Sequence, residues 1–238
     1  MTGLEARLVV ERDGFRLDAA LAVPPGRVVA LLGRNGAGKS TALAAIAGLL
    51  PLTAGRIVLG DIVLDDPDAG VLLPPERRPV GLVQQQAPLF PHLTVLDNVA
   101  FGLRTAGTGR GAARRRAAAL LDDAGLDALA ARRPAALSGG QAARVALVRA
   151  LAREPALLLL DEPLAAIDAE RRPALRDAIA ERLAAFAGSA LLVTHDARDA
   201  EALADEVVVL DEGSVVQSGG LADLRAAPAS GVVARLLQ

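Results

Sequence analysis

The sequence predicts an α/β fold in which a core with a parallel sheet is joined to an antiparallel β subdomain and an inserted α-helical subdomain. Three observations carry this prediction. The N-terminal segments alternate apolar and polar residues around tight turns, as antiparallel hairpins do. The stretch from about residue 94 to about residue 153 reads mostly as helix. After it, short apolar runs alternate with helical stretches, which indicates parallel strands joined by right-handed crossovers.

Two hairpins, one buried strand and one helix are expected in the first 64 residues. The turns Arg12-Asp13-Gly14 and Gly60-Asp61 each separate two short segments of strand character. A continuous apolar run follows Pro24-Pro25-Gly26, and such a run suits a buried parallel strand. The strands are expected at residues 4–10, 15–23, 27–32, 57–59 and 62–64, and the helix at residues 39–50.

The part of the chain after residue 155 is expected to return to alternating strands and helices. Its apolar runs are short and continuous, as buried parallel strands are. The strands are expected at residues 156–160, 189–194 and 206–210, and the helices at residues 169–187 and 197–203.

Composition excludes several classes of protein. The 238 residues suffice for one large α/β domain with a small helical lobe, and the net charge of −2 carries no basic footprint of a nucleic-acid partner. Cysteine is absent, so disulfides and thiolate metal sites are excluded. No apolar run approaches the roughly 18 residues of a membrane helix, and the charged N-terminus does not read as a signal peptide.

A phosphate-binding loop lies between a predicted strand and a predicted helix. It fits the pattern G-x-x-x-x-G-K-[ST] and reads Gly33-Arg34-Asn35-Gly36-Ala37-Gly38-Lys39-Ser40-Thr41. Lys39 is the only lysine among 26 basic residues. In such a loop, glycines let backbone N–H groups approach a phosphate, the lysine reaches the β- and γ-phosphates, and the serine hydroxyl binds Mg²⁺. The run therefore predicts a nucleoside triphosphate site.

Two carboxylates follow the apolar strand expected at 156–160. Asp161 and Glu162 stand at its carboxyl end, the sheet edge at which the phosphate loop also lies. We expect Asp161 to hold Mg²⁺ through a coordinated water. Glu162 is then placed to act as general base toward the attacking water.

A second anion-binding helix start is expected at Ser138-Gly139-Gly140-Gln141. Ser138 can cap the helix that follows, and the two glycines expose backbone N–H groups. One nucleotide does not need two such sites in one chain. We therefore expect this segment to complete the site of a second copy of the chain.

The run Leu137-Ser138-Gly139-Gly140-Gln141 resembles the signature of the ABC-type ATPases, and the resemblance extends along nearly the whole chain. It implies a P-loop NTPase, RecA-like parallel-sheet core with the two subdomains described above. It also implies one nucleotide-binding domain over residues 1–238, with the core at about 1–90 and 155–238 and the helical subdomain at about 94–153. The implied activity is Mg²⁺-dependent ATP hydrolysis in a head-to-tail dimer that sandwiches ATP.

The same resemblance implies roles for three further residues. Gln85 resembles the glutamine that senses Mg²⁺ and the membrane partner, although Gln84 and Gln86 leave this assignment open by one position. Asp168 resembles the aspartate of the D-loop. His195 resembles the switch histidine that contacts the γ-phosphate.

The stretch Leu89–Leu103 resembles the importer branch of the family, in which a groove receives a helix of the membrane subunit. Leu89, Phe90 and Leu93 are candidates for its floor. The short N-terminal hairpin and the run Pro74–Arg78 look like molybdate- or sulfate-type importer ATPases. The implied partners are permease subunits and a periplasmic or extracellular solute-binding protein, and the implied location is the cytoplasmic face of a bacterial membrane.

Several alternatives stay open at this point. An efflux ATPase, a soluble non-transport ABC ATPase and a small-molecule phosphotransferase all share the phosphate loop. Members of the molybdate type often carry a C-terminal regulatory domain, which is not expected here because the chain stops at Gln238. Phe15 is a candidate for adenine stacking but reads more readily as a strand core residue, and His92 reads equally well as an ordinary loop residue.

Overall fold

An antiparallel sheet forms from the N-terminal segments. The computed structural model describes residues 3–12, 14–86, 88–165 and 167–237. The sheet has the order β2-β1-β4-β5-β6, and both predicted hairpins are present. Its strands are β1 (Leu4–Arg12), β2 (Phe15–Val23), β4 (Ala54–Leu59), β5 (Ile62–Asp66) and the short β6 (Val71–Leu72).

The second sheet is the predicted parallel core. Its order is β11-β10-β3-β9-β8-β7, and every neighbouring pair except β10 and β11 is parallel. The strands are β3 (Val28–Gly33), β7 (Val80–Val83), β8 (Leu157–Asp161), β9 (Ser189–Thr194), β10 (Glu206–Asp211) and β11 (Ser214–Gly219). Because β3, β8 and β9 run in one direction, their carboxyl ends meet at one edge of the sheet.

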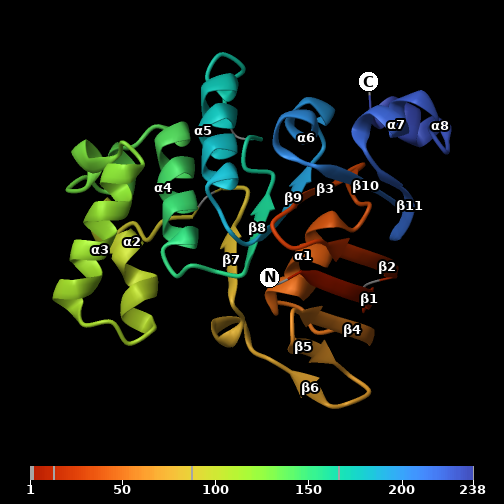
Figure 1. The fold of residues 1–238 in the computed structure, drawn as a ribbon, viewed down its shortest axis with the longest axis horizontal. Coiled ribbons are helices and arrows are strands. Elements are labelled where there is room, and N and C mark those ends of the chain that lie inside the picture. The colour runs from red at the N-terminus through yellow and green to blue at the C-terminus, as the bar shows by residue number, and fades with distance from the viewer. Residues whose placement is uncertain (1–2, 13, 87, 166, 238) are drawn as a thin grey trace.

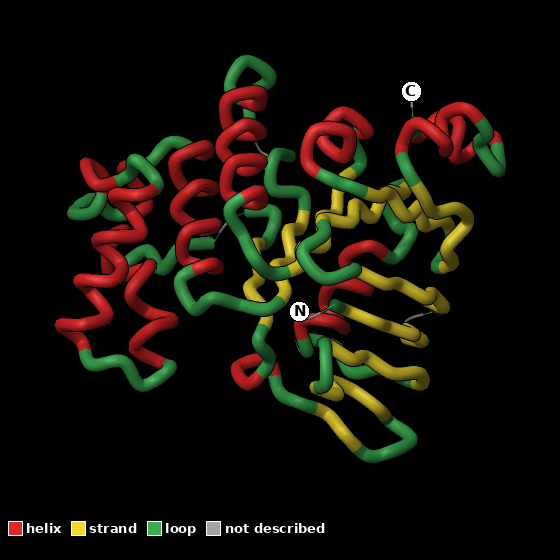
Figure 2. The backbone as a smooth tube through the Cα atoms, in the orientation of Figure 1, coloured by secondary structure: helices red, strands yellow, loops and turns green. Residues whose placement is uncertain are grey.

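Helix α1 (Lys39–Ala47) separates the two sheets. Alternate residues of the parallel strands, such as Leu157 and Leu159, pack with α1 and the antiparallel sheet in one core. Their neighbours Leu158 and Leu160 point to the opposite face and pack against other helices. This period of two lets continuous apolar strands fill cores on both sides. Figures 1 and 2 show α1 between the sheets.

Three helices form a lobe with a core of its own. They are α2 (Val95–Thr105), α3 (Arg110–Asp123) and α4 (Gly139–Leu151). The short 3₁₀ turns η2 (Asp127–Leu129) and η3 (Pro134–Ala136) connect α3 to α4. In Figure 1 the lobe lies at the left, on the far side of α5 from the antiparallel sheet.

The remaining helices cover the other face of the parallel sheet. They are α5 (Arg172–Ala184), α6 (Ala197–Leu203), α7 (Leu221–Ala226) and α8 (Gly231–Leu236). A further 3₁₀ turn, η1 (Pro75–Arg77), precedes β7. Among the described residues, no helix is long and apolar enough to cross a membrane.

Several predicted boundaries were wrong by a few residues. Helix α1 ends at Ala47 instead of residue 50, because Gly48 adopts the left-handed conformation (φ 81°) and stops it. Helix α5 is shorter at both ends than residues 169–187. Strand β9 and helix α6 agree with the prediction. Strands β6, β7 and β11 and helices α7 and α8 were not predicted.

Candidate functional site

The phosphate loop connects β3 to α1 and takes the backbone shape that its glycines allow. Gly36 and Gly38 have φ values of 82° and 105°, a region that favours glycine. A Cβ at Gly33 would lie 2.3 Å from the carbonyl oxygen of Leu210, so this position also has no room for a side chain. The loop continues directly into the N-terminus of α1, where backbone N–H groups can bind an anion.

Lys39 is almost completely buried, with 5% of its surface exposed. Its Nζ donates hydrogen bonds to the backbone carbonyls of Gly33 (2.8 Å) and Arg34 (3.0 Å). Burial lowers the pKa of this ammonium, and the charges of Glu162 and Asp161 oppose that shift. The cation is thus held inside the loop, close to two carboxylates.

Ser40 and Asp161 bring two oxygen atoms that can bind a cation close together beside the phosphate loop. Ser40 Oγ lies 3.5 Å from Asp161 Oδ1, at the carboxyl end of β8. Burial raises the pKa of Asp161 most strongly and the charge of Glu162 raises it further, while Ser40 and Lys39 act in the opposite direction. The position thus favours a bound cation, which would stabilise the partly buried carboxylate.

Glu162 is the centre of a small polar group. One of its oxygens, Oε2, accepts a hydrogen bond from Gln85 Nε2 (3.2 Å) and lies 3.3 Å from His195 Nδ1. Its backbone has a φ of 44°, which is rare for a residue with a side chain and is typical of functional sites. Among the three adjacent glutamines, Gln85 is the one placed against Glu162, while Gln84 lines a separate groove.

The phosphate loop, Gln85, Glu162 and His195 contribute to the lining of an open cavity of about 870 Å³. The lining is formed by Phe15, Asn35, Gly36, Gly38, Lys39, Ser40, Thr41, Gln85, Glu162, Ala165 and His195. Phe15 packs against the core, as expected, but also belongs to this lining. A Cβ at Gly38 would lie 2.9 Å from its ring, so the ring covers the loop.

The segment Ser138–Gln141 and Asp168 do not line the cavity. Ser138 and Gln141 instead form a capping box at the start of α4: Gln141 N donates to Ser138 Oγ (3.3 Å), and Ser138 N donates to Gln141 Oε1 (3.0 Å). The carbonyl of Asp168 accepts from the backbone N–H groups of Arg171 and Arg172, at 3.0 Å each. Ala166, two residues before Asp168, lies outside the described residues.

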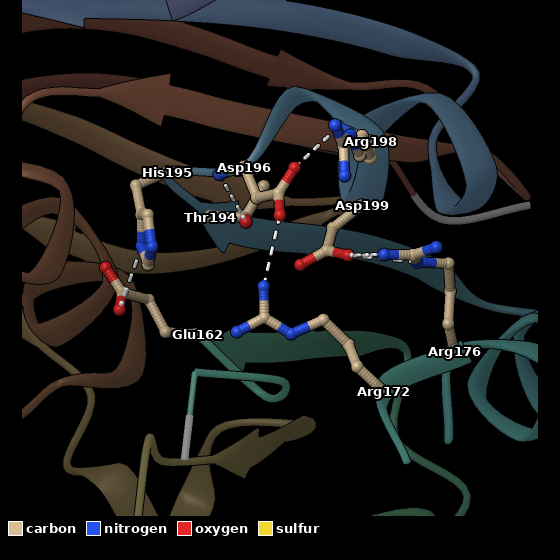
Figure 3. A network of polar contacts seen from close by, with 8 residues as sticks. All are labelled: Glu162, Arg172, Arg176, Thr194, His195, Asp196, Arg198 and Asp199. Carbon is tan, nitrogen blue, oxygen red and sulfur yellow. Dashed lines mark hydrogen bonds and ion pairs between the residues drawn. The ribbon is translucent and has the colours of Figure 1, made fainter. Parts of the chain in front are cut away.

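The sequence analysis missed the groups that surround His195. Thr194 and Asp196 flank it, and Arg172 and Arg176 reach this region from α5 (Figure 3). An aspartate directly before a helical stretch is a cap signal that sequence analysis can recognise. The two arginines carry no such signal, because their partners lie more than 20 residues away.

A second groove of about 460 Å³ lies between the stretch that follows β7 and the helical lobe. The rings of Phe90 and Phe101 contact each other there in a tilted arrangement, with centroids 4.5 Å apart and an interplanar angle of 47°, and Arg149 lies over the Phe90 ring. Leu89 and Phe90 line the groove as predicted, whereas Leu93 is not part of its lining. His92 is exposed, outside the groove.

A phosphate loop, two carboxylates at the end of one strand and a histidine, all at one edge of a parallel sheet, define a nucleoside-triphosphate-binding protein. Residues 17–165 match the ABC transporter family. The chain is 47% identical over 240 residues to the molybdenum import ATP-binding protein ModC of Mycobacterium tuberculosis (strain ATCC 25618 / H37Rv), covering 99% of this chain and 64% of that protein. It therefore belongs to the ABC transporter family, and the predicted ABC ATPase fold is confirmed.

Two further relatives were found. The Fe(3+) ions import ATP-binding protein FbpC of Rhizobium etli is 44% identical over 217 residues, covering 91% of this chain and 60% of that protein. A dimeric ATP-binding cassette solved in a post-hydrolysis state with ADP and Pi has a TM-score of 0.74 at 28% identity, covering 92% of this chain and 98% of that one. The chain spans less than two thirds of the length of the two import proteins.

Proposed function

We propose that this chain is the ATP-hydrolysing subunit of an ABC importer. The observation that carries the proposal is the position of Glu162. Its Oε2 faces both Gln85 and His195 in the cavity lined by the phosphate loop. A carboxylate held in this way can take a proton from a water that attacks a bound triphosphate.

The triphosphate is proposed to lie on the phosphate loop, within residues 33–41. The N–H groups at the start of α1 and the dipole of that helix favour the anion. In this structure Lys39 Nζ donates hydrogen bonds to two carbonyls of the loop. We expect Nζ to turn to the β- and γ-phosphates when ATP binds. Phe15, beside Gly38 in the cavity lining, is the candidate for contact with the base.

Ser40 and Asp161 fit Mg²⁺, which prefers hard oxygen ligands. No cluster of three or more acidic, histidine or cysteine side chains that could hold a metal by itself is found among the described residues. This suits an ion that takes only one or two protein ligands and completes its shell with phosphates and water. When bound, Mg²⁺ supplies Lewis-acid stabilisation of phosphate charge. Gln85, also proposed for this site, bonds to Glu162 in this structure.

The proposed reaction is the hydrolysis of ATP to ADP and inorganic phosphate. The oxygen of water forms a bond to the γ-phosphorus, the bond from that phosphorus to the bridging oxygen of ADP breaks, and Glu162 accepts a proton from the water. His195 lies 3.3 Å from Glu162 through Nδ1 and lines the same cavity, and we propose that it contacts the γ-phosphate.

A second copy of the chain is proposed to complete the site. The N-terminus of α4 is rigidly capped, yet its Ser138–Gln141 segment does not line the cavity of its own chain. The similar solved structure is a dimer with ADP and Pi, which supports a dimer, and we propose a head-to-tail arrangement of the two copies. In it, Ser138–Gln141 and Asp168 of one copy would face the nucleotide of the other.

The groove around Phe90 is proposed to receive a helix of a membrane permease. Its floor is aromatic, and Arg149 and Arg153 border it, so the fitting segment carries apolar residues and a carboxylate. This docking would place the chain at the cytoplasmic face of the membrane, as part of a complex with a solute-binding protein.

The proposed solute is molybdate or a related oxyanion. The similarity to a molybdenum import protein over almost the whole chain supports this choice. Similarity to Fe(3+) import proteins is only slightly lower, and ferric iron is therefore the second candidate. ATP hydrolysis by the complex reconstituted with its permease and binding protein, measured with molybdate and with ferric iron, distinguishes the two solutes.

The Glu162→Gln variant tests the ATPase proposal. It should bind ATP but hydrolyse it at least about 10²-fold more slowly, because the amide cannot accept the proton. It should also accumulate as a dimer with ATP in size-exclusion chromatography. Glu76→Gln, at an exposed position in η1, is the control. A fully active Glu162→Gln protein would refute the role of Glu162.

A further inference from the structure

Two arginine–aspartate pairs join α5 to α6 beside the candidate site (Figure 3). Arg172 Nη1 lies 3.1 Å from Asp196 Oδ2, and Arg176 Nη2 lies 2.6 Å from Asp199 Oδ1. The two arginines are one helical turn apart and therefore face the same neighbour. Both carboxylates stand at the N-terminus of α6, where the helix dipole favours negative charge. Both pairs are therefore arginine–carboxylate contacts between the same two helices, although Arg176 donates through both Nε and Nη2 to the more buried Asp199.

Only the first pair adjoins His195. Asp196 follows His195 directly, and its backbone N–H donates to Thr194 Oγ1 (3.1 Å). Its side chain caps α6 through Oδ1, which accepts from the backbone N–H of Arg198 (2.9 Å), while Oδ2 faces Arg172. The residue after His195 is therefore held at three points, which fixes the backbone from which the imidazole extends toward Glu162.

Arg172 also contacts the segment that contains Asp168. Its backbone N–H donates to the carbonyl of Asp168 (3.0 Å) at the start of α5. One residue thus touches both the loop of Asp168 and the residue next to His195. Arg176 stands one turn further along the helix, and its partner Asp199 lies inside α6.

The guanidinium of Arg172 contacts Asp196 through Nη1. Within the described part of the chain, its Nε is a buried donor with no hydrogen-bond partner. A buried unsatisfied donor lowers stability. The side chain is thus held by its contact with Asp196, and a change at either residue acts on that contact.

From this geometry we propose that Arg172 is a positioning residue for ATP hydrolysis. It acts through Asp196 to keep His195 directed at Glu162, and it makes that orientation depend on the loop of Asp168. Because this loop is proposed to face a second copy, the arrangement links dimer formation to the placement of His195. The inference rests on the proposed function, in which Glu162 and His195 act at the γ-phosphate.

The test compares Arg172→Gln with the matched control Arg176→Gln, with ATP hydrolysis measured on the purified chain. Arg172→Gln should lower kcat about tenfold or more and leave KM within about twofold, because a displaced group affects the reacting geometry more than binding. Arg176→Gln should keep kcat within about twofold even where it lowers the melting temperature. Asp196→Asn, which can still cap α6, should reproduce the effect of Arg172→Gln.

A double variant separates positioning from general weakening. If Arg172 acts through His195, then Arg172→Gln should add no further loss of kcat to His195→Ala. Equal losses in Arg172→Gln and Arg176→Gln, or a full additional loss in the double variant, would overturn the proposal.

A second measurement does not depend on hydrolysis. The chain has two histidines, so His195 can be followed by the NMR signal of its ring, assigned with His195→Ala, with exposed His92 as the internal reference. Arg172→Gln should move the His195 signal, and Arg176→Gln should leave it in place. An unmoved signal in Arg172→Gln refutes the positioning role, whereas an inactive wild-type chain refutes only the proposed function.

Discussion

Lys39 Nζ donates a 2.8 Å hydrogen bond to the carbonyl of Gly33, six residues earlier in the phosphate loop. A second bond to Arg34 holds the same ammonium in a position that is almost fully buried. The loop therefore encloses a compact cation that can turn from carbonyl groups to phosphate oxygens. This geometry is the basis of the first prediction.

Lys39→Arg should lower ATP hydrolysis about 10²-fold although it keeps the charge. A planar guanidinium is larger and has fixed donor directions, so it cannot occupy the space between Gly33 and Arg34. Steady-state hydrolysis and equilibrium ATP binding are the measurements, and Lys39→Met gives the effect of losing the charge altogether. A rate equal to that of the wild type would show that the lysine is not required.

Asp161→Asn should stabilise the nucleotide-free protein at about pH 7 while it impairs hydrolysis. The pKa of Asp161 is raised above its ordinary value of 3.8, mainly by burial. Between the pKa in the unfolded chain and the higher pKa in the folded protein, the folded protein therefore binds more protons than the unfolded chain. Stability therefore falls as the pH rises through this window, and the whole penalty is present above it. The variant avoids this penalty.

The measurement for Asp161→Asn is thermal unfolding without nucleotide. The melting temperature should rise by about 2 °C or more at about pH 7, and the gain should shrink toward about pH 4. Asp61→Asn, at an exposed position, should not change it. A gain that does not depend on pH would contradict the electrostatic explanation.

Arg78 should be essential for stability. Its side chain is fully buried and donates to the carbonyls of Ala45 and Ile46 at the end of α1 (2.8 Å each), while Nη2 lies 3.8 Å from Asp65. Arg78→Met would remove these hydrogen bonds and leave the buried carboxylate of Asp65 without its cation, held only by the backbone N–H of Leu52. The expected loss is about 3–5 kcal/mol of unfolding free energy, measured by urea denaturation.

The neighbouring arginine is the control for this experiment. Arg77 is exposed, so Arg77→Met should change the unfolding free energy by no more than about 0.5 kcal/mol. A similar loss in both variants would mean that the contacts of Arg78 are not the cause.

Phe15→Ala should weaken ATP binding more than catalysis. The ring covers Gly38 and lines the cavity, and an aromatic contact with a base contributes about 1–3 kcal/mol. KM for ATP should therefore rise about tenfold with little change in kcat. Phe15→Leu preserves the packing against the core and should show most of the same effect, because it also lacks the ring. If Phe15→Leu binds ATP like the wild type, the ring does not contact the base.

The fold was largely predictable because its signals are local and strong. Strand β9 and helix α6 were found with their observed ends, and the two sheets and the helical lobe follow from hydrophobic periodicity. Strand β11 was missed because none of its residues is buried, so no apolar pattern marks it. Helices α7 and α8 have six residues each, which is too short for a clear helical period.

By itself, the sequence determined the chemistry that lies in continuous runs. Lys39, Ser40, Asp161, Glu162 and His195 each follow a strand of the parallel sheet, and parallel strands bring their carboxyl ends to one edge. Only the tertiary structure decided which of three adjacent glutamines faces Glu162, that Phe15 covers the loop, and that Arg172 meets Asp196. These contacts depend on side-chain directions between segments far apart in the chain, and no local pattern of residues encodes them.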